Sequence, residues 1–154
     1  MNRRQTLLAL ALMPLMANAA GNHGGGHQTA TGSPGNPAQV DRTIEVRMSD
    51  RMRFVPDHIR VTAGQTIRFA VTNTGNQPHE MVIGSLEALK EHARQMRQQP
   101  GMAHDEPNMI RLAGGESGNL VWHFEEPGQV DYACLIPGHL AAGMKGTIDV
   151  RAPE

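Results

Sequence analysis

The sequence predicts an all-β domain, a Greek-key β-sandwich or barrel that carries one inserted α-helix. Apolar and polar residues alternate over several short segments, which is the pattern of half-buried strands. Turn-forming pairs such as Ala63-Gly64 and Pro127-Gly128 separate these segments. One stretch has helical spacing instead. Short strands divided by turns are typical of two packed sheets whose end loops can converge on a site.

The expected strands follow one another from residue 43 to the end of the chain. In the first, Ile44, Val46 and Met48 alternate with Glu45 and Arg47. Four more have the same alternation, at Ile67, Phe69 and Val71; at Leu120, Trp122 and Phe124; at Val130, Tyr132 and Cys134; and at Ile148 and Val150. We expect these apolar faces, with their aromatic side chains, to form the core.

One helix is predicted between Ser85 and Pro100. Ser85 is a good N-cap, and Glu87 in the first turn suits the positive end of the helix dipole. The apolar side chains that recur near helical spacing are Leu86, Leu89, Ala93 and Met96. Pro100-Gly101 ends the segment.

The chain is expected to have three parts: a signal peptide at 1–19, a flexible His- and Gly-rich leader at 20–41, and the β-domain at 42–154. Arg3 and Arg4 precede an apolar stretch, Leu7 to Met16, that is too short to span a bilayer, and Ala17-Asn18-Ala19 fits a cleavage site. The leader has almost no apolar side chains and cannot bury enough surface to order itself. We therefore expect a periplasmic protein, exported by either the Sec or the twin-arginine route.

Composition restricts the partners and makes the single cysteine informative. The 154-residue chain has a formal net charge of −1, and loss of Arg3 and Arg4 with the signal would make it −3. A mildly acidic domain argues against nucleic acid and against an anionic membrane as partners. Cys134 can form no internal disulfide. In an oxidising compartment its thiol is then a buried apolar group, an intermolecular bridge or a metal ligand.

Three potential metal donors lie in one loop with the spacing Cys-x4-His-x4-Met, namely Cys134, His139 and Met144. Between the first two, Pro137-Gly138 supplies a tight turn that lets the loop fold back. A thiolate, an imidazole and a weak thioether, completed by a second imidazole, form the trigonal site that binds redox-active copper. Zinc fits less well because it gains little from a thioether. The sequence thus predicts one copper ion.

His79 is the best candidate for the second imidazole. It follows the turn-rich segment 73–78 and precedes the apolar run 81–83, which places it at the mouth of a strand. His58 and His104 are weaker substitutes. The other histidines are expected in the leader, on the helix or on an outward strand face, at His23, His27, His92 and His123.

The ligand loop and the upstream Asn76-Gln77-Pro78-His79 resemble the cupredoxins, the type 1 copper proteins that include azurin and rusticyanin. The chain is most similar to the periplasmic copper-tolerance cupredoxins of the CopI type, through Met52-Arg53-Phe54, His79 to Gly84, Pro107-Asn108-Met109 and Cys134 to Gly146. The resemblance covers roughly residues 42–151. It implies a cupredoxin-like fold with equatorial ligands His79, Cys134 and His139 and axial Met144.

One residue departs from the pattern of the better-known electron carriers. They usually have Asn or Ser after the first histidine ligand, whereas this chain has Glu80. The residue at this place belongs to the outer hydrogen bonding of the thiolate. The sequence therefore leaves that hydrogen bond open.

Two functions fit the same copper chemistry. The first is one-electron Cu(I)/Cu(II) chemistry in periplasmic copper handling and tolerance, with a redox partner protein or copper-handling proteins. The second is a soluble electron carrier for a respiratory or nitrogen-oxide pathway. A metal-free structural β-sandwich is a third interpretation. We expect no enzyme, because the chain has no His-x-His pair for a multicopper cluster and no evident Ser-His-Asp arrangement.

Softer features could add to copper binding or docking. A Pro- and Gly-containing loop gathers Met96, Met102, His104 and Met109, which could form a second Cu(I) site, although helix core and loop packing explain them more simply. Two histidines of the leader, His23 and His27, could collect Cu(II). Apolar residues flank His139 in sequence, so we expect an apolar collar that suits brief docking with a redox partner.

Overall fold

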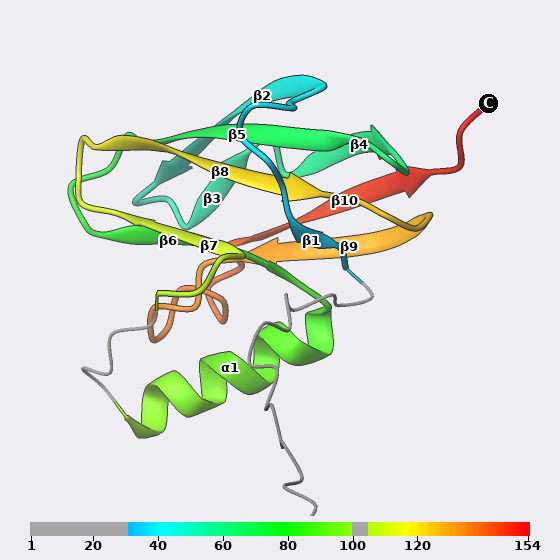
Figure 1. Ribbon diagram of the computed structural model, residues 1–154. Coiled ribbons are helices and arrows are strands. Elements are labelled where there is room, and N and C mark those ends of the chain that lie inside the picture. The colour runs from blue at the N-terminus through cyan, green and yellow to red at the C-terminus, as the bar shows by residue number, and fades with distance from the viewer. Residues whose placement is uncertain (1–30, 100–104) are drawn as a thin grey trace, which may run out of the picture.

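Two five-stranded β-sheets lie face to face, and the one helix among the described residues packs against the second sheet (Figure 1). The computed structural model describes residues 31–99 and 105–154. Within this part of the chain the predicted β-sandwich with one inserted helix is confirmed. No helix among the described residues is both long and apolar enough to cross a membrane.

The first sheet has the strand order β1-β8-β5-β2-β3. Its strands are β1 (Ser33–Pro34), β2 (Arg42–Ser49), β3 (Arg53–Val55), β5 (Thr66–Asn73) and β8 (Ser117–His123). The second sheet has the order β4-β10-β9-β6-β7. Its strands are β4 (His58–Thr62), β6 (His79–Gly84), β7 (Met109–Leu112), β9 (Gly128–Ala133) and β10 (Lys145–Arg151).

The alternation seen in the sequence corresponds to burial. In β2 the side chains of Ile44, Val46 and Met48 are buried and those between them are exposed. β5 and β8 contribute Phe69 and Trp122 to the same core. Two pairings are parallel, β2 with β5 and β4 with β10, while the other pairs are antiparallel. The core between the sheets is therefore the one that the period-two pattern predicts.

The short strands β1, β3, β4 and β7 were not among the expected ones. β1 lies inside the stretch predicted to be a flexible leader, yet it pairs with β8. The indole N–H of Trp122 also donates a hydrogen bond to the backbone oxygen of Thr31 at 2.8 Å. The part of the chain that packs against the β-domain therefore begins at residue 31 or earlier. Backbone contacts hold this segment, which is why its lack of apolar side chains gave no signal. The predicted signal peptide, His23 and His27 lie outside the described residues.

The helix α1 (Leu86–Gln98) agrees with the prediction at both its start and its buried face. The Ser85 hydroxyl accepts a hydrogen bond from the backbone N–H of Ala88, as expected of an N-cap. Leu89, Ala93 and Met96 are the buried side chains. Two of them, Leu89 and Ala93, pack against residues of β6, β9 and the segment after β9, namely Val82, Ala133 and Leu135.

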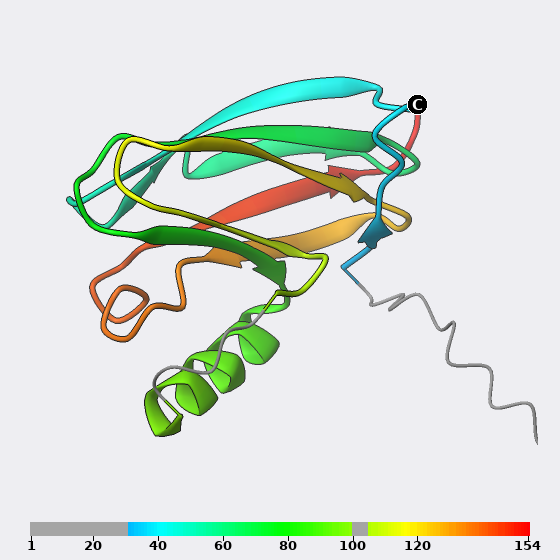
Figure 2. The same cartoon turned by 60° about the vertical axis from the view of Figure 1, so that its left-hand side comes forward.

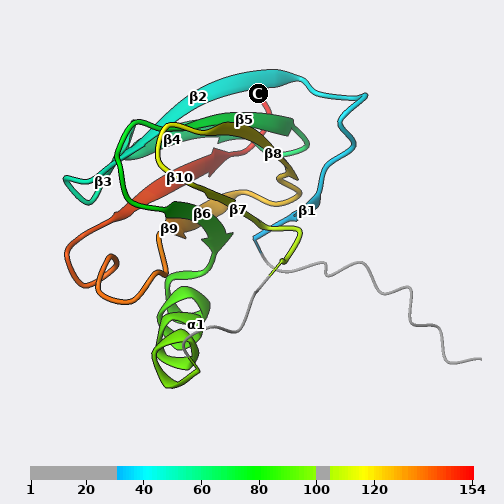
Figure 3. The ribbon, with the colours of Figure 1, turned by 90° about the vertical axis from the view of Figure 1, so that its left-hand side faces the viewer.

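Several connections meet at one end of the sandwich, and those nearest the expected ligands concern the site. These are the turn from β2 to β3, the turn from β5 to β6, and the long loop from β9 to β10, drawn in orange (Figure 2). Figure 3, which looks at this end, shows the orange loop beside α1. The loops that carry the expected ligands therefore lie together, as the sequence analysis requires.

Candidate metal centre

Three buried side chains form a compact donor cluster at this end of the sandwich. His79 comes from the start of β6, Cys134 follows the end of β9, and His139 lies in the loop from β9 to β10. One ligand atom from each, two ring nitrogens and the sulfur, lie within 4.8 Å of one another. The two imidazole rings have centroids 5.0 Å apart. Residues 55 positions apart in sequence are thus brought around a single point.

The loop after β9 folds back on itself through short backbone hydrogen bonds. The N–H of His139 donates to the Ile136 oxygen at 3.0 Å, and the N–H of Met144 donates to the His139 oxygen at 3.0 Å. Gly138 adopts a positive φ of 92°, a conformation that other residues rarely adopt. The Cys134 N–H then donates to the Met144 oxygen at 3.1 Å. These bonds set Met144 directly across from Cys134 where β10 begins.

A carboxylate orients the ring of His79. Its Nε2 lies 2.9 Å from Oδ1 of Asp50, which follows β2. Asp50 also accepts hydrogen bonds from the backbone N–H groups of Asn76 and Gln77. The Asn76 N–H, followed by the His79 ring, lowers the pKa of Asp50, so this carboxyl stays ionised at neutral pH. An ionised carboxylate accepts the Nε2 proton and leaves the lone pair on Nδ1.

The second nitrogen of His79 is left without a hydrogen-bond partner within residues 31–99 and 105–154. Nδ1 is buried and accepts no hydrogen bond from the described residues. A buried nitrogen with a free lone pair costs free energy unless something satisfies it. Because this atom belongs to the donor cluster, a metal ion fits the position. Nitrogen, thiolate and nitrogen are also the donor types that copper prefers.

Cys134 and His139 contact each other inside the cluster. Sγ lies 3.2 Å from Nδ1 of His139. Burial raises the pKa of the Cys134 thiol to about 11, although the backbone N–H groups of Glu80 and Ile136 oppose this shift. Burial, followed by the nearby His79, lowers the pKa of His139, so its ring is neutral at pH 7. A cation that binds here would displace the thiol proton and meet the neutral imidazole of His139.

Comparison with known proteins identifies the class to which this site belongs. The family of copper-binding proteins of the plastocyanin/azurin type matches residues 40–151, which include the whole donor cluster. The chain belongs to this family. It is therefore a copper-binding cupredoxin, and the His-Cys-His cluster of the structure has the donor set that this metal needs.

Relatives of this cupredoxin have names that refer to copper. A copper-resistant cuproprotein CopI of Rubrivivax gelatinosus is 43% identical over 96% of this chain and 96% of its own length. A protein of the same name from Pseudomonas aeruginosa is 32% identical over 97% of this chain and 98% of its own length. Among solved structures, auracyanin B superposes with a TM-score of 0.64 at 26% identity, covering 78% of this chain and 96% of that one.

The sequence did not show whether the Cys134 sulfur receives a hydrogen bond from residue 80, and the backbone of Glu80 provides one. The hydrogen bond to the Cys134 sulfur comes from the backbone N–H of residue 80, so it does not depend on which side chain stands there. The carboxylate has another contact, because its Oε1 accepts the backbone N–H of Leu135 at 3.1 Å. The unusual side chain therefore adds an interaction and removes none from the sulfur.

Two supporting residues were not recognised in the sequence. Asp50 follows a strand that pairs in parallel with β5, and this pairing brings it to the turn before His79. Asn73 is fully buried, and its amide donates to the backbone oxygens of Gln77, Leu112 and Ala113. In the sequence, Asn73 was interpreted only as part of a turn. Asp50 and Asn73 share one local feature that could have indicated a supporting role, namely a polar residue at the end of a strand.

The other candidates lie apart from the cluster or outside the described residues. His58 is on β4 and contacts the Thr147 hydroxyl at 2.9 Å, while His123 contacts the Thr66 hydroxyl at 3.0 Å. His92 is on α1. Of the Met- and His-containing loop, Met96 is buried on the helix and Met109 packs against the cluster that includes Leu89 and Ala93. Met102 and His104 lie outside the described residues.

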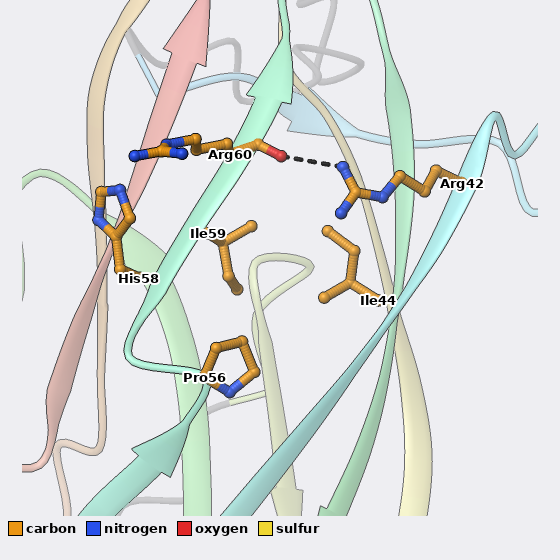
Figure 4. A pocket seen from close by; sticks show the side chains of 6 residues that line it. All are labelled: Arg42, Ile44, Pro56, His58, Ile59 and Arg60. Atoms are coloured by element: carbon orange, nitrogen blue, oxygen red, sulfur yellow. Dashed lines mark hydrogen bonds between the residues drawn. The ribbon is translucent and has the colours of Figure 1, made fainter.

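A separate hollow lies where β2 and β4 of the two sheets approach each other (Figure 4). Ile44 and Ile59 face each other across it, and the Arg42 guanidinium donates to the Arg60 backbone oxygen at 3.0 Å. Its lining also includes Pro56 and His58. No cysteine, methionine or acidic side chain lines this hollow, so it lacks the donors of a second copper site.

Proposed function

We propose that this protein holds one type 1 copper ion and cycles it between Cu(I) and Cu(II) in periplasmic copper handling and tolerance. Nδ1 of His79, Sγ of Cys134 and Nδ1 of His139 would hold the ion, and the Met144 thioether would be a fourth, weaker donor. The observation that carries the proposal is the buried Nδ1 of His79, which has no hydrogen-bond partner in the described part of the chain and belongs to the cluster with the other two donors. The fully buried Met144 side chain, beside Cys134 in the backbone ladder, supports the fourth ligand.

The protein residues suit one-electron chemistry by holding the donors in place. Copper supplies the electron, and it transfers that electron fastest where the ligands need not rearrange. Asp50 fixes the His79 ring, and backbone N–H groups of Glu80 and Ile136 reach the sulfur. The hydrogen bonds of the β9–β10 loop hold His139 and Met144 against Cys134. Each ligand is thus restrained by a hydrogen bond of its side chain or of its backbone.

A small apolar surface around His139 supports electron exchange with a partner protein. His139 is 9% exposed, so one edge of its ring reaches the surface. Around it, Pro137, Ala141 and Ala142 are exposed, and Ile136 and Leu140 are partly buried. An apolar patch of this kind favours short-lived contacts in which the imidazole edge lies close to the partner.

The role in copper tolerance rests on the named relatives. The cuproproteins that match this chain over nearly its full length are called copper-resistant. Export to the periplasm is supported by the signal-like residues 1–19, with their arginines, apolar stretch and small-residue cleavage site. In that compartment a cupredoxin can oxidise, reduce or retain copper before it reaches the cytoplasm. We expect no catalytic activity beyond this electron exchange.

Deletion of the gene tests the role in the cell. We expect the deletion strain to stop growing at a copper concentration that the parent tolerates, and wild-type protein to restore growth. The control is Cys134→Ser, which keeps a folded exported chain without the thiolate and should not restore it. Normal copper tolerance combined with loss of a respiratory activity would instead favour the soluble electron carrier.

A further inference from the structure

A buried carboxylate beside the metal centre is not part of the ligand set. Glu80 follows His79 in β6, and its side chain is only 2% exposed. Acidic side chains are seldom buried this deeply without partners, because they lose the solvation of water. The residue also stands next to one ligand in sequence and contacts the segment of another. Its position therefore needs an explanation beyond packing.

Two contacts hold the Glu80 carboxylate. The backbone N–H of Leu135 donates to Oε1 at 3.1 Å, and Nη1 of Arg111 lies 3.9 Å from Oε2. The second contact follows from the sheet register, since Glu80 lies directly opposite Arg111 in the antiparallel pair of β6 and β7. The two oxygens of the carboxylate are therefore directed to different neighbours, Oε1 to the ligand loop and Oε2 to β7.

The first contact joins two segments that carry ligands. Leu135 follows Cys134, and Glu80 follows His79, so the bond between them ties the start of the β9–β10 loop to β6. The backbone N–H of Glu80 reaches the Cys134 sulfur as well. One residue thus restrains the thiolate through its backbone and the adjoining loop through its side chain.

We propose that the Glu80 carboxylate positions the ligand loop and lowers the reduction potential of the copper centre. This inference rests on the copper site proposed above. A negative charge beside the ligands stabilises Cu(II), the more positive oxidation state, relative to Cu(I). Burial keeps this charge poorly screened, whereas the opposing Arg111 side chain is 53% exposed and better screened by water. The carboxylate therefore outweighs the guanidinium at the metal.

The main test is the reduction potential of copper-loaded Glu80→Gln at pH 7. Glutamine keeps an oxygen acceptor for the Leu135 N–H and removes the charge. At a fixed solution potential we expect the Cu(I)/Cu(II) ratio to rise at least tenfold, an upward shift of about 59 mV for a one-electron couple. Arg111→Gln should shift the potential downward by less. The matched control is Glu126→Gln, the same charge change at an exposed residue before β9, at the far end of the strand from Cys134, which should leave the potential unchanged.

Positioning is tested without copper, by hydrogen exchange of the Leu135 amide in the metal-free protein. We expect Glu80→Ala to speed this exchange at least tenfold, because the acceptor is lost, and Glu80→Gln to stay close to wild type. Equal exchange in wild type and Glu80→Ala would overturn the positioning role.

Three results separate failure of this inference from failure of the copper site. An unchanged potential in Glu80→Gln, with copper bound as in wild type, overturns the inference alone. A shift of Glu80→Gln and Arg111→Gln in the same direction also overturns it, because charge then does not decide the sign. If wild type itself forms no copper thiolate centre, the proposed function fails. Should Glu80→Gln not fold, an upward shift in Arg111→Gln is enough to overturn the inference.

Discussion

At the scale of single residues, the bond between His79 and Asp50 determines which ring nitrogen is left for a metal. The Asp50 carboxylate lies 2.9 Å from Nε2, so the proton stays on that nitrogen and Nδ1 keeps its lone pair. An ionised partner also makes the imidazole a better electron donor. Ligand strength at this site therefore depends on a residue that does not touch the metal.

Asp50→Ala should weaken copper binding by about 10- to 100-fold, the usual effect of losing a partner that orients a metal ligand. The His79 ring loses its acceptor and can rotate or change its tautomer. Competition with a chelator of known copper affinity measures the change. Asp149→Ala, which removes an exposed acid paired with Arg151 on β10, is the control and should bind copper like wild type. Equal affinity of the two variants would contradict the role given to Asp50.

Cys134→Ser should abolish the strong visible absorption of the copper-loaded protein. This absorption arises from charge transfer between a thiolate and Cu(II), and a serine hydroxyl cannot supply it. The structural change is small, because serine has nearly the shape of the fully buried cysteine. A spectrum recorded after addition of one equivalent of Cu(II) checks this. Persistence of the band in the serine variant would remove Cys134 from the ligand set.

Met144→Leu should leave copper bound and raise its reduction potential, by about 59 mV if the Cu(I)/Cu(II) ratio changes tenfold. Loss of the thioether removes a weak donor that favours Cu(II). Leucine has a similar volume, so the fully buried position should tolerate it for less than about 1.5 kcal/mol. Redox titration provides the measurement, with Met48→Leu, another fully buried methionine from the core, as the matched control. An equal potential in both variants would place Met144 outside the site.

The residues that carry the chemistry were predictable, whereas their supports were not. Cys134, His139 and Met144 lie in one loop, so their spacing alone indicates a metal site. The role of Asp50 depends on the parallel pairing of β2 with β5, and that of Glu80 on its register against Arg111. Neither a pairing nor a register can be read from alternating apolar residues. The structure therefore adds most to what the sequence predicts at the side chains that surround and support the ligands.

At the scale of elements, α1 supports the ligand loop from the side. Leu89 and Ala93 form a small apolar cluster with Leu135, the residue after Cys134, and Leu140, the residue after His139, packs against it. The helix thus contacts the loop on both sides of the ligand pair. Its ends and its buried face were predicted because the cap and the helical spacing are local signals.

Leu89→Ala should destabilise the metal-free protein by about 2–5 kcal/mol, because it opens a cavity under the helix. Leu89 is 2% exposed, so little of the space can be filled by water or by relaxation. Urea unfolding measures the change. Lys90→Ala, one position along on the exposed face of the same helix, should change stability by less than about 0.5 kcal/mol. Equal stability of both variants would show that the packing of Leu89 contributes little to the fold.

The strands divide into those with a clear local pattern and those without one. β2, β5 and β8 alternate over seven or eight residues and were predicted. β1, β3 and β7 span only two to four residues, too few for a period to be recognised. β4 does alternate, at Ile59 and Val61, but it pairs in parallel with the last strand of the chain. Such a distant partner leaves no mark in the local sequence.

At the scale of the whole molecule, the metal centre draws on both sheets. Asp50 and Asn73 end or follow strands of the first sheet, while His79 and Cys134 begin or follow strands of the second. The turns and loop that carry them lie at one end of the sandwich (Figure 2). Binding that joins both sheets at this end opposes their separation, so copper should stabilise the entire fold.

Copper loading should therefore raise the melting temperature of the whole domain. A ligand present at 100 times its dissociation constant adds about 2.7 kcal/mol to the free energy of unfolding, provided that it does not bind the unfolded chain. For a domain of this size that corresponds to a rise of roughly 10 °C. Calorimetry of the metal-free and copper-loaded proteins, at one protein concentration, measures it. Cys134→Ser should lose most of the rise, since the thiolate ligand is then missing. A copper-loaded wild type that melts at the temperature of the metal-free protein would mean that the three donors do not bind one ion in common.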